Sequence, residues 1–280
     1  MKLAFFQPKR IMSMFSDWLL RLGISKRQRY VLATLVLTFM LILTQVVSQD
    51  YRYLFVFSLS FFTFVLSALC LHEDLKGIEW FTLLILPTLY SAAVALFYFL
   101  LPVRWLTRIP IAALYAFGLY ALLLTENIYN VAANRTIALL RAAHSVGFLI
   151  TFVTYFLLVQ TVFAFRVGPL LNSVAIGIIS FILTFQFLWA MELEEKASER
   201  LVSVSIVLTF VFMQLTWILS FWPVPRMMAA LFLSSVFYSL VGMTQLYMVE
   251  KMYKKTVIEF FFVCIVVSLI FLATTRWRGV

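Results

Sequence analysis

Long runs of apolar residues alternate with short polar connections along the whole chain. Each run approaches the roughly 20 residues that a helix needs to cross the hydrocarbon core of a bilayer. In lipid, backbone polar groups need partners within the protein, and long runs without alternation favour helices over barrel strands. We expect nine spans, approximately at 30–48, 53–71, 81–101, 109–125, 145–165, 170–191, 201–221, 226–249 and 256–273. The fourth is the weakest and can extend further, and eight or ten spans are alternatives.

The composition supports the same class of protein. Hydrophobic residues make up 64% of the 280 residues, 30 of them Phe, and only 12% of the chain is charged. A soluble domain carries about 25% charged residues. The sequence therefore predicts an all-α polytopic transmembrane bundle in which residues 30–280 form one domain. The connections between spans are too short to fold into a soluble domain.

The first 29 residues have a pattern of their own. Apolar residues recur there with the spacing of one helix face, at Ile11, Met14, Phe15, Trp18, Leu19 and Leu22. Gly23 can end this helix before the basic cluster at 26–29. We interpret residues 1–29 as a cytoplasmic segment with an amphipathic helix that lies on the membrane surface. Docking of a soluble partner to this helix is the alternative.

Lys and Arg predict the orientation. With the N-terminus in the cytoplasm, the inside segments hold fifteen basic residues and the outside segments seven. The positive-inside rule favours this orientation, although seven of the fifteen precede the first span. Nine spans would place the C-terminus outside. Basic loops beside anionic lipids also explain the net charge of +10, so we expect no nucleic-acid partner. The expected location is a bacterial plasma membrane.

Polar residues gather between the fourth and fifth spans, in the segment ENIYNVAANRTIALLRAAHS at 126–145. Wound as one unbroken helix at about 100° per residue, this segment places its polar side chains on one face. The candidate site residues on that face are Glu126, Asn130, Asn134, Arg141 and His144. A helix in the cytoplasmic interface explains the pattern. In the alternative, part of the segment enters the bundle and lines a polar cavity.

Other chemistry-bearing residues predict no metal or cofactor site. His72, Glu73 and Asp74 have no second histidine within sequence reach, so a metal ion is not expected there. Cys70 and Cys264 fall inside predicted spans, where we interpret them as small apolar residues.

The segment NIYNVAANRTIALLRAAHSVGF resembles, in a general way, uncharacterised multi-pass inner-membrane proteins of bacteria. This resemblance covers about forty residues, includes no mechanistic motif and implies no function.

The sequence thus favours a non-enzymatic membrane component, either a transporter of small solutes or lipids or a subunit of a membrane complex. Membrane lipids and a membrane-protein partner are the expected interaction classes. The alternative is a membrane-embedded enzyme that acts on lipid or lipid-linked substrates at the cytoplasmic face. It would use Glu126 or His144 as acid or base, and these residues would have to converge with Arg141.

Overall fold

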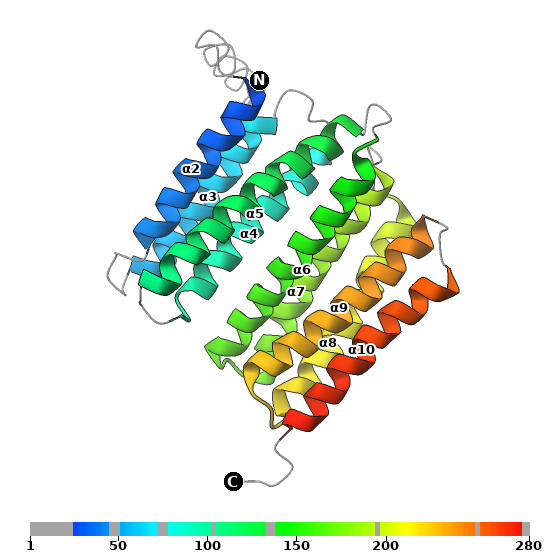
Figure 1. Ribbon diagram of the computed structural model, residues 1–280. Helices are drawn as coiled ribbons and strands as arrows, with labels where there is room; N and C mark the ends of the chain where they lie inside the picture. Colours follow the sequence, from blue (N-terminus) through cyan, green and yellow to red (C-terminus); the bar gives the residue numbers. More distant parts are fainter. Residues whose placement is uncertain are drawn as a thin grey trace, which may run out of the picture. The chain divides into compact units, whose positions relative to one another are not determined.

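The computed structural model describes residues 25–44, 51–71, 78–101, 105–132, 138–193, 197–249 and 253–275. The regular structure in these ranges consists of nine helices: α2 (Lys26–Thr44), α3 (Arg52–Leu71), α4 (Glu79–Tyr98), α5 (Trp105–Ala132), α6 (Leu140–Phe165), α7 (Pro169–Glu192), α8 (Glu199–Phe221), α9 (Arg226–Met248) and α10 (Lys254–Thr274) (Figure 1). All nine are long and apolar enough to cross a membrane. The predicted all-α polytopic membrane fold is therefore confirmed. The amphipathic helix predicted from Ile11 to Leu22 lies outside the described residues.

The fourth span differs most from its prediction, because α5 continues past residue 125 to Ala132. Polar residues interrupt the apolar run here, but the protein accommodates them. The hydroxyl of Thr125 donates to the carbonyl of Ala121 one turn earlier, at 2.9 Å. Glu126 is 0% exposed. The helix therefore persists where hydropathy alone suggested its end.

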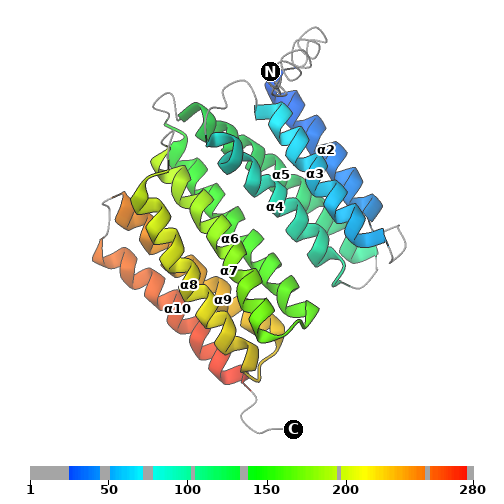
Figure 2. The ribbon, with the colours of Figure 1, turned by 180° about the vertical axis from the view of Figure 1, so that it is seen from behind.

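The helices group into two compact units. The first comprises 1–92 and 103–143, and within it α2 packs against both α3 and α5. The second comprises 93–102 and 144–280, and it contains α7 to α10 with nearly all of α6. Its most extensive contacts join α7 to α8 and α9 to α10. Figures 1 and 2 show that successive helices run up and down within each unit.

Aromatic rings form the core of the second unit. Tyr155 of α6 stacks on Phe237 of α9 with ring centroids 4.0 Å apart. The Tyr155 hydroxyl is also hydrogen-bonded to that of Ser180 on α7, at 3.1 Å. Phe212 of α8 lies 5.5 Å from Phe237. Such pairs contribute about 0.5–1.5 kcal/mol each beyond the burial of apolar area. The rings join α6, α8 and α9, and the hydrogen bond to Ser180 adds α7.

The α9–α10 pair approaches closely at a small residue. A Cβ atom added to Gly242 of α9 would lie 2.5 Å from the ring of Phe260 on α10. Ser239, almost one turn earlier on α9, donates its hydroxyl proton to the carbonyl of Phe260 at 3.0 Å. Small residues commonly allow membrane helices to approach in this way. Gly242 and Ser239 therefore set the spacing of α9 and α10.

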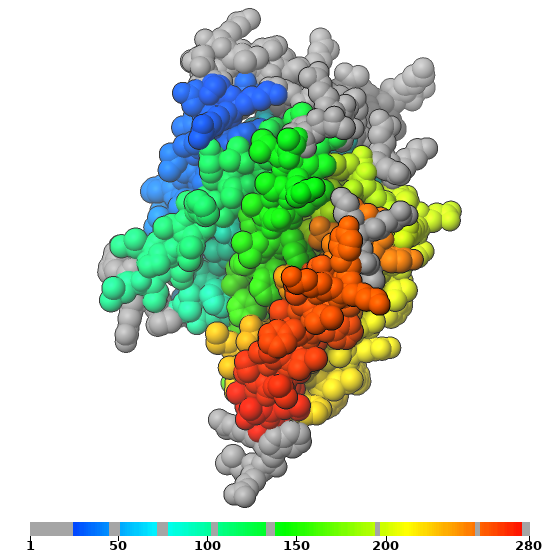
Figure 3. All heavy atoms as spheres, turned by 45° about the vertical axis from the view of Figure 1, so that its right-hand side comes forward, coloured from blue at the N-terminus to red at the C-terminus, as the bar shows by residue number. Residues whose placement is uncertain are grey.

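Apolar side chains cover the outward face of α10. The buried residue of this helix is Phe271. Large apolar side chains are exposed along it, including Ile258, Phe261, Phe262, Ile265 and Leu269. Figure 3 shows α10, in orange-red, on the surface of the second unit. An exposed apolar face of this length suits contact with lipid tails.

Candidate functional site

The polar segment at 126–145 does not form one helix. α5 ends at Ala132, and α6 begins only at Leu140, after a turn at 138–139. The single polar face predicted for this segment is therefore wrong, because it assumed an unbroken helix. The connection at 133–139 contains neither Gly nor Pro, the residues that most often mark the end of a helix, so the sequence did not predict the turn.

The five predicted site residues therefore do not share one helix. Glu126 and Asn130 belong to α5 in the first unit, where they are 0% and 1% exposed. Their burial contradicts the interfacial interpretation, in which these side chains would face water. Arg141 is exposed near the start of α6, and His144 is partly buried on the same helix, where the second unit begins. Asn134 lies outside the described residues.

In the first unit, the polar residues of α5 connect neighbouring helices. The side-chain amide of Asn130 donates to the carbonyl of Leu71 at the end of α3, at 3.1 Å. Tyr30 of α2 donates its hydroxyl proton to Oδ1 of Asn127, at 2.9 Å. Interhelical hydrogen bonds of this type contribute about 0.6–2 kcal/mol each in membranes. This end of α5 is polar because its side chains tie α2 and α3 to it.

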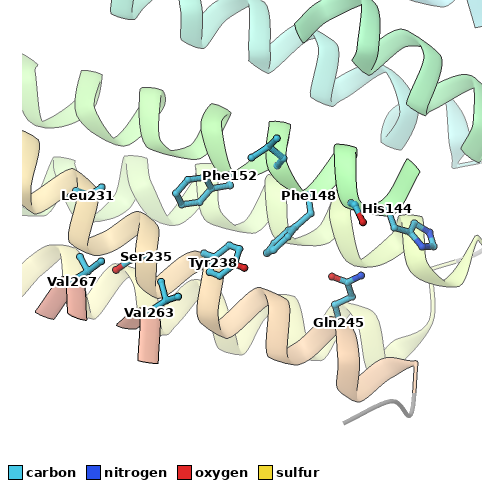
Figure 4. A pocket seen from close by; sticks show the side chains of 11 residues that line it. His144, Phe148, Phe152, Leu231, Ser235, Tyr238, Gln245, Val263 and Val267 are labelled. Atoms are coloured by element: carbon cyan, nitrogen blue, oxygen red, sulfur yellow. The ribbon is translucent and has the colours of Figure 1, made fainter. Parts of the chain in front are cut away.

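In the second unit, α6, α9 and α10 enclose a groove of about 570 Å³ (Figure 4). Its lining residues are His144, Ser145, Phe148, Leu149, Phe152, Leu231, Ser235, Tyr238, Gln245, Val263 and Val267. Along α9 the groove extends from Leu231 to Gln245, which at 1.5 Å per residue is about 20 Å. That length exceeds the roughly 15 Å of one hydrocarbon leaflet, half of a 30 Å core.

The two ends of the groove differ in polarity. His144 and Ser145 are near the start of α6, and Gln245 is near the end of α9, so these three polar residues share one end. Figure 4 shows Phe152 and Val267 toward the other end. The groove therefore has a polar mouth, formed by His144, Ser145 and Gln245, and a mainly apolar body. The body also includes Tyr238 and Ser235, and the Ser235 hydroxyl donates to the Phe232 carbonyl.

His144 is fixed by a backbone group. Its Nε2 atom lies 3.0 Å from the carbonyl oxygen of Ala190 on α7. Because a carbonyl only accepts, Nε2 carries a proton in this hydrogen bond. The bond orients the imidazole at the polar mouth of the groove.

Sequence reasoning identified His144 but missed Gln245 and Tyr238. Both are polar residues inside the predicted span 226–249, and polar residues within a span can mark a binding site. What the sequence did not indicate is that they face the start of the fifth span.

The described ranges contain no group of three or more His, Cys, Asp or Glu side chains that could hold a metal ion. The sequence cluster at His72, Glu73 and Asp74 lies outside those ranges.

A family model described as a protein of unknown function, DUF5656, matches residues 71–274, from the end of α3 to the end of α10. The chain therefore belongs to this family, and the predicted membership of an uncharacterised family is confirmed. Neither curated proteins nor solved structures give a match.

Proposed function

We propose that this member of the DUF5656 family is a non-enzymatic membrane component that binds a lipid molecule in the groove between α6, α9 and α10. The observation that carries this proposal is the groove's division into a polar mouth and an apolar body. A lipid has the same division between its headgroup region and its acyl chains.

The chemistry of the groove fits both parts of a lipid. At the mouth, the Ser145 hydroxyl and the Gln245 amide offer donors and acceptors for glycerol, ester or headgroup oxygens. In the body, rings such as Phe148 and Phe152 offer large apolar surfaces to an acyl chain. Lipid tails in a bilayer are already out of water, so burying them in the groove adds little free energy. Selectivity would therefore come from the mouth and from the fit to the rings.

The lining of the groove favours binding over catalysis. Among its described lining residues there is no Asp or Glu that could act with His144 as an acid–base pair. Nε2 of His144 is engaged with the Ala190 carbonyl. Glu126, the other residue on which the enzyme alternative depends, is not among the residues that line the groove.

For location, we propose a bacterial plasma membrane with the N-terminus in the cytoplasm, as the basic N-terminal segment favours. The groove's mouth then belongs to the cytoplasmic leaflet. A Ser145→Cys variant lacking Cys70 and Cys264 tests the orientation. A membrane-impermeant thiol reagent is expected to label it from the cytoplasmic side alone, and labelling only from the outside would contradict the proposed orientation.

Filling the groove tests the binding proposal. Val267→Trp places an indole in the apolar body. The matched control is Val266→Trp, at the preceding residue, which is exposed and does not line the groove. The full chain is reconstituted in nanodiscs with a phosphatidylcholine that carries a photoactivatable acyl chain, and crosslinked residues are located by mass spectrometry.

The wild type and Val266→Trp are expected to crosslink at groove residues such as Phe148 and Val263, and Val267→Trp is expected to lose this labelling. Equal labelling of the two Trp variants would contradict lipid binding in the groove.

A further inference from the structure

A second hollow lies at the other end of the second unit, where α6 ends and α9 begins. It has a volume of about 830 Å³ and is lined by two basic side chains, Arg166 directly after α6 and Arg226 at the first position of α9. The described carboxylates of this unit, Glu192, Glu199 and Glu259, belong to the opposite ends of their helices. This end of the unit therefore carries positive charge without a described carboxylate to balance it.

Arg166 and Arg226 are available to a ligand. Both are exposed, and neither guanidinium forms a hydrogen bond or ion pair with a residue in the described ranges. Arg166 has a φ of 55°, in the left-handed region that residues other than glycine seldom adopt. A residue in this conformation commonly ends an α-helix, as Leu193 does after α7. The turn after α6 thus holds a cation beside the hollow in an unusual backbone conformation.

The start of α9 adds backbone donors. Pro225 precedes the helix and provides no side-chain cap. Its carbonyl accepts from the N–H groups of Met228 and Ala229, so the N–H groups of Arg226 and Met227 remain at the open start of the helix. Helix starts stabilise anions through these N–H groups and the helix dipole. Here the helix start coincides with both arginines, because Pro225 and Met227 also line the hollow.

Gln160 of α6 also lines the hollow and adds an amide group beside the two arginines. Its side chain can donate hydrogen bonds to an anion through its NH₂ group.

We propose that this hollow binds a phosphate ester. Guanidinium groups pair with phosphate oxygens through two parallel hydrogen bonds, and N–H groups at a helix start bind the same anion. The source is either the headgroup of an anionic phospholipid, since the hollow lies at the ends of membrane-spanning helices, or a water-soluble phosphate ester. This site is separate from the α6–α9–α10 groove and does not depend on the function proposed for it.

The lipid source is tested with the full chain in phosphatidylcholine nanodiscs that contain a minor amount of spin-labelled phosphatidylglycerol or spin-labelled phosphatidylcholine. Electron paramagnetic resonance measures the fraction of label that the protein immobilises. The test variant is the double substitution R166Q/R226Q. The matched control is R200Q, an exposed arginine at the other end of the same unit, which stacks on the Tyr247 ring at 4.7 Å.

We expect the wild type and R200Q to prefer phosphatidylglycerol, and R166Q/R226Q to lose the preference by roughly tenfold or more. The charge-keeping variant R166K/R226K should regain most of it. This variant keeps the test informative if the Gln variant folds poorly, which thermal unfolding in pure phosphatidylcholine nanodiscs would reveal.

The soluble source is tested by adding glycerol 3-phosphate, at matched ionic strength, to protein in pure phosphatidylcholine nanodiscs. Thermal stabilisation of the wild type but not of R166Q/R226Q, without a lipid preference, would assign the site to a soluble phosphate ester. The site is overturned if the double Gln variant binds both probes as the wild type does, or if R200Q loses as much binding as the double variant.

Discussion

The contact between α9 and α10 supports a specific prediction, because a Cβ atom added at Gly242 would meet the Phe260 ring. In the variant Gly242→Ala, the new methyl group would lie 2.5 and 2.6 Å from two ring carbons of Phe260, and 3.4 Å from the ring of Phe148. Carbon atoms in ordinary contact are about 3.5–4.0 Å apart. The Phe260 ring would therefore have to retreat by about 1 Å.

The Phe260 ring is half-buried, and two contacts oppose this movement. Its centroid lies 5.2 Å from that of Tyr238 on α9, and the carbonyl of Phe260 accepts the hydrogen bond from Ser239. Overpacking of this kind costs about 1–3 kcal/mol. Replacing Gly by Ala within a helix gains up to about 1 kcal/mol. With the middle of the first range and the full gain, we expect Gly242→Ala to lower the free energy of unfolding by about 1 kcal/mol.

The assay is equilibrium unfolding in mixed detergent micelles, with rising SDS content and helicity followed by circular dichroism. The control is Gly168→Ala at the start of α7, where an added Cβ would meet no atom within 4 Å. Val263 and Val267 of α10 line the groove, so a displacement of α10 in Gly242→Ala should also change lipid crosslinking there. The reasoning is refuted if Gly242→Ala is as stable as the wild type while Gly168→Ala is neutral.

Three further predictions concern hydrogen bonds, and each is checked by the same unfolding assay. Ser198→Ala removes the cap at the start of α8, where the Ser198 hydroxyl accepts from the Leu201 N–H at 3.1 Å, and should cost about 1 kcal/mol; no loss would mean that solvent caps this helix equally well. Tyr155→Phe loses only a hydroxyl and should cost about 1 kcal/mol, whereas Tyr155→Ala also loses the stacked ring and should cost about 3–5 kcal/mol; equal losses would argue against a stacked core. Asn130→Leu leaves the Leu71 carbonyl without this donor and should cost about 1–3 kcal/mol, and a more stable variant would contradict the tie between α5 and α3.

The fold could be predicted from the sequence because each span is a local property. A long apolar run needs no information from the rest of the chain to be read as a membrane helix. The error in α5 has the same origin. Thr125 and Glu126 lower the local hydropathy, but their burial depends on contacts that only the packed unit provides.

The candidate site was harder to predict because it combines distant parts of the chain. His144 was recognisable as a lone histidine at a span boundary, but its neighbours Gln245 and Val263 come from two later helices. Asn130 was grouped with His144 by helical periodicity alone. A turn at 138–139 lies between α5, which carries Asn130, and α6, which carries His144. The spacing of polar residues along the sequence does not predict whether a helix is interrupted between them.

The proposed orientation decides on which side of the membrane the proposed phosphate-ester site lies. With the N-terminus inside, Arg166 and Arg226 lie on the outer side, where the positive-inside rule disfavours basic residues. A bound phosphate ester supplies a reason for their position, because it neutralises charge that no described carboxylate of this unit balances there. If Ser145→Cys labelling instead reverses the orientation, the two arginines face the cytoplasmic leaflet, whose anionic lipids attract basic residues at about 1 kcal/mol each. General attraction predicts that R166Q, R226Q and R200Q each lose about the same binding, because each removes one charge. A larger loss in R166Q or R226Q than in R200Q separates a built site from this attraction.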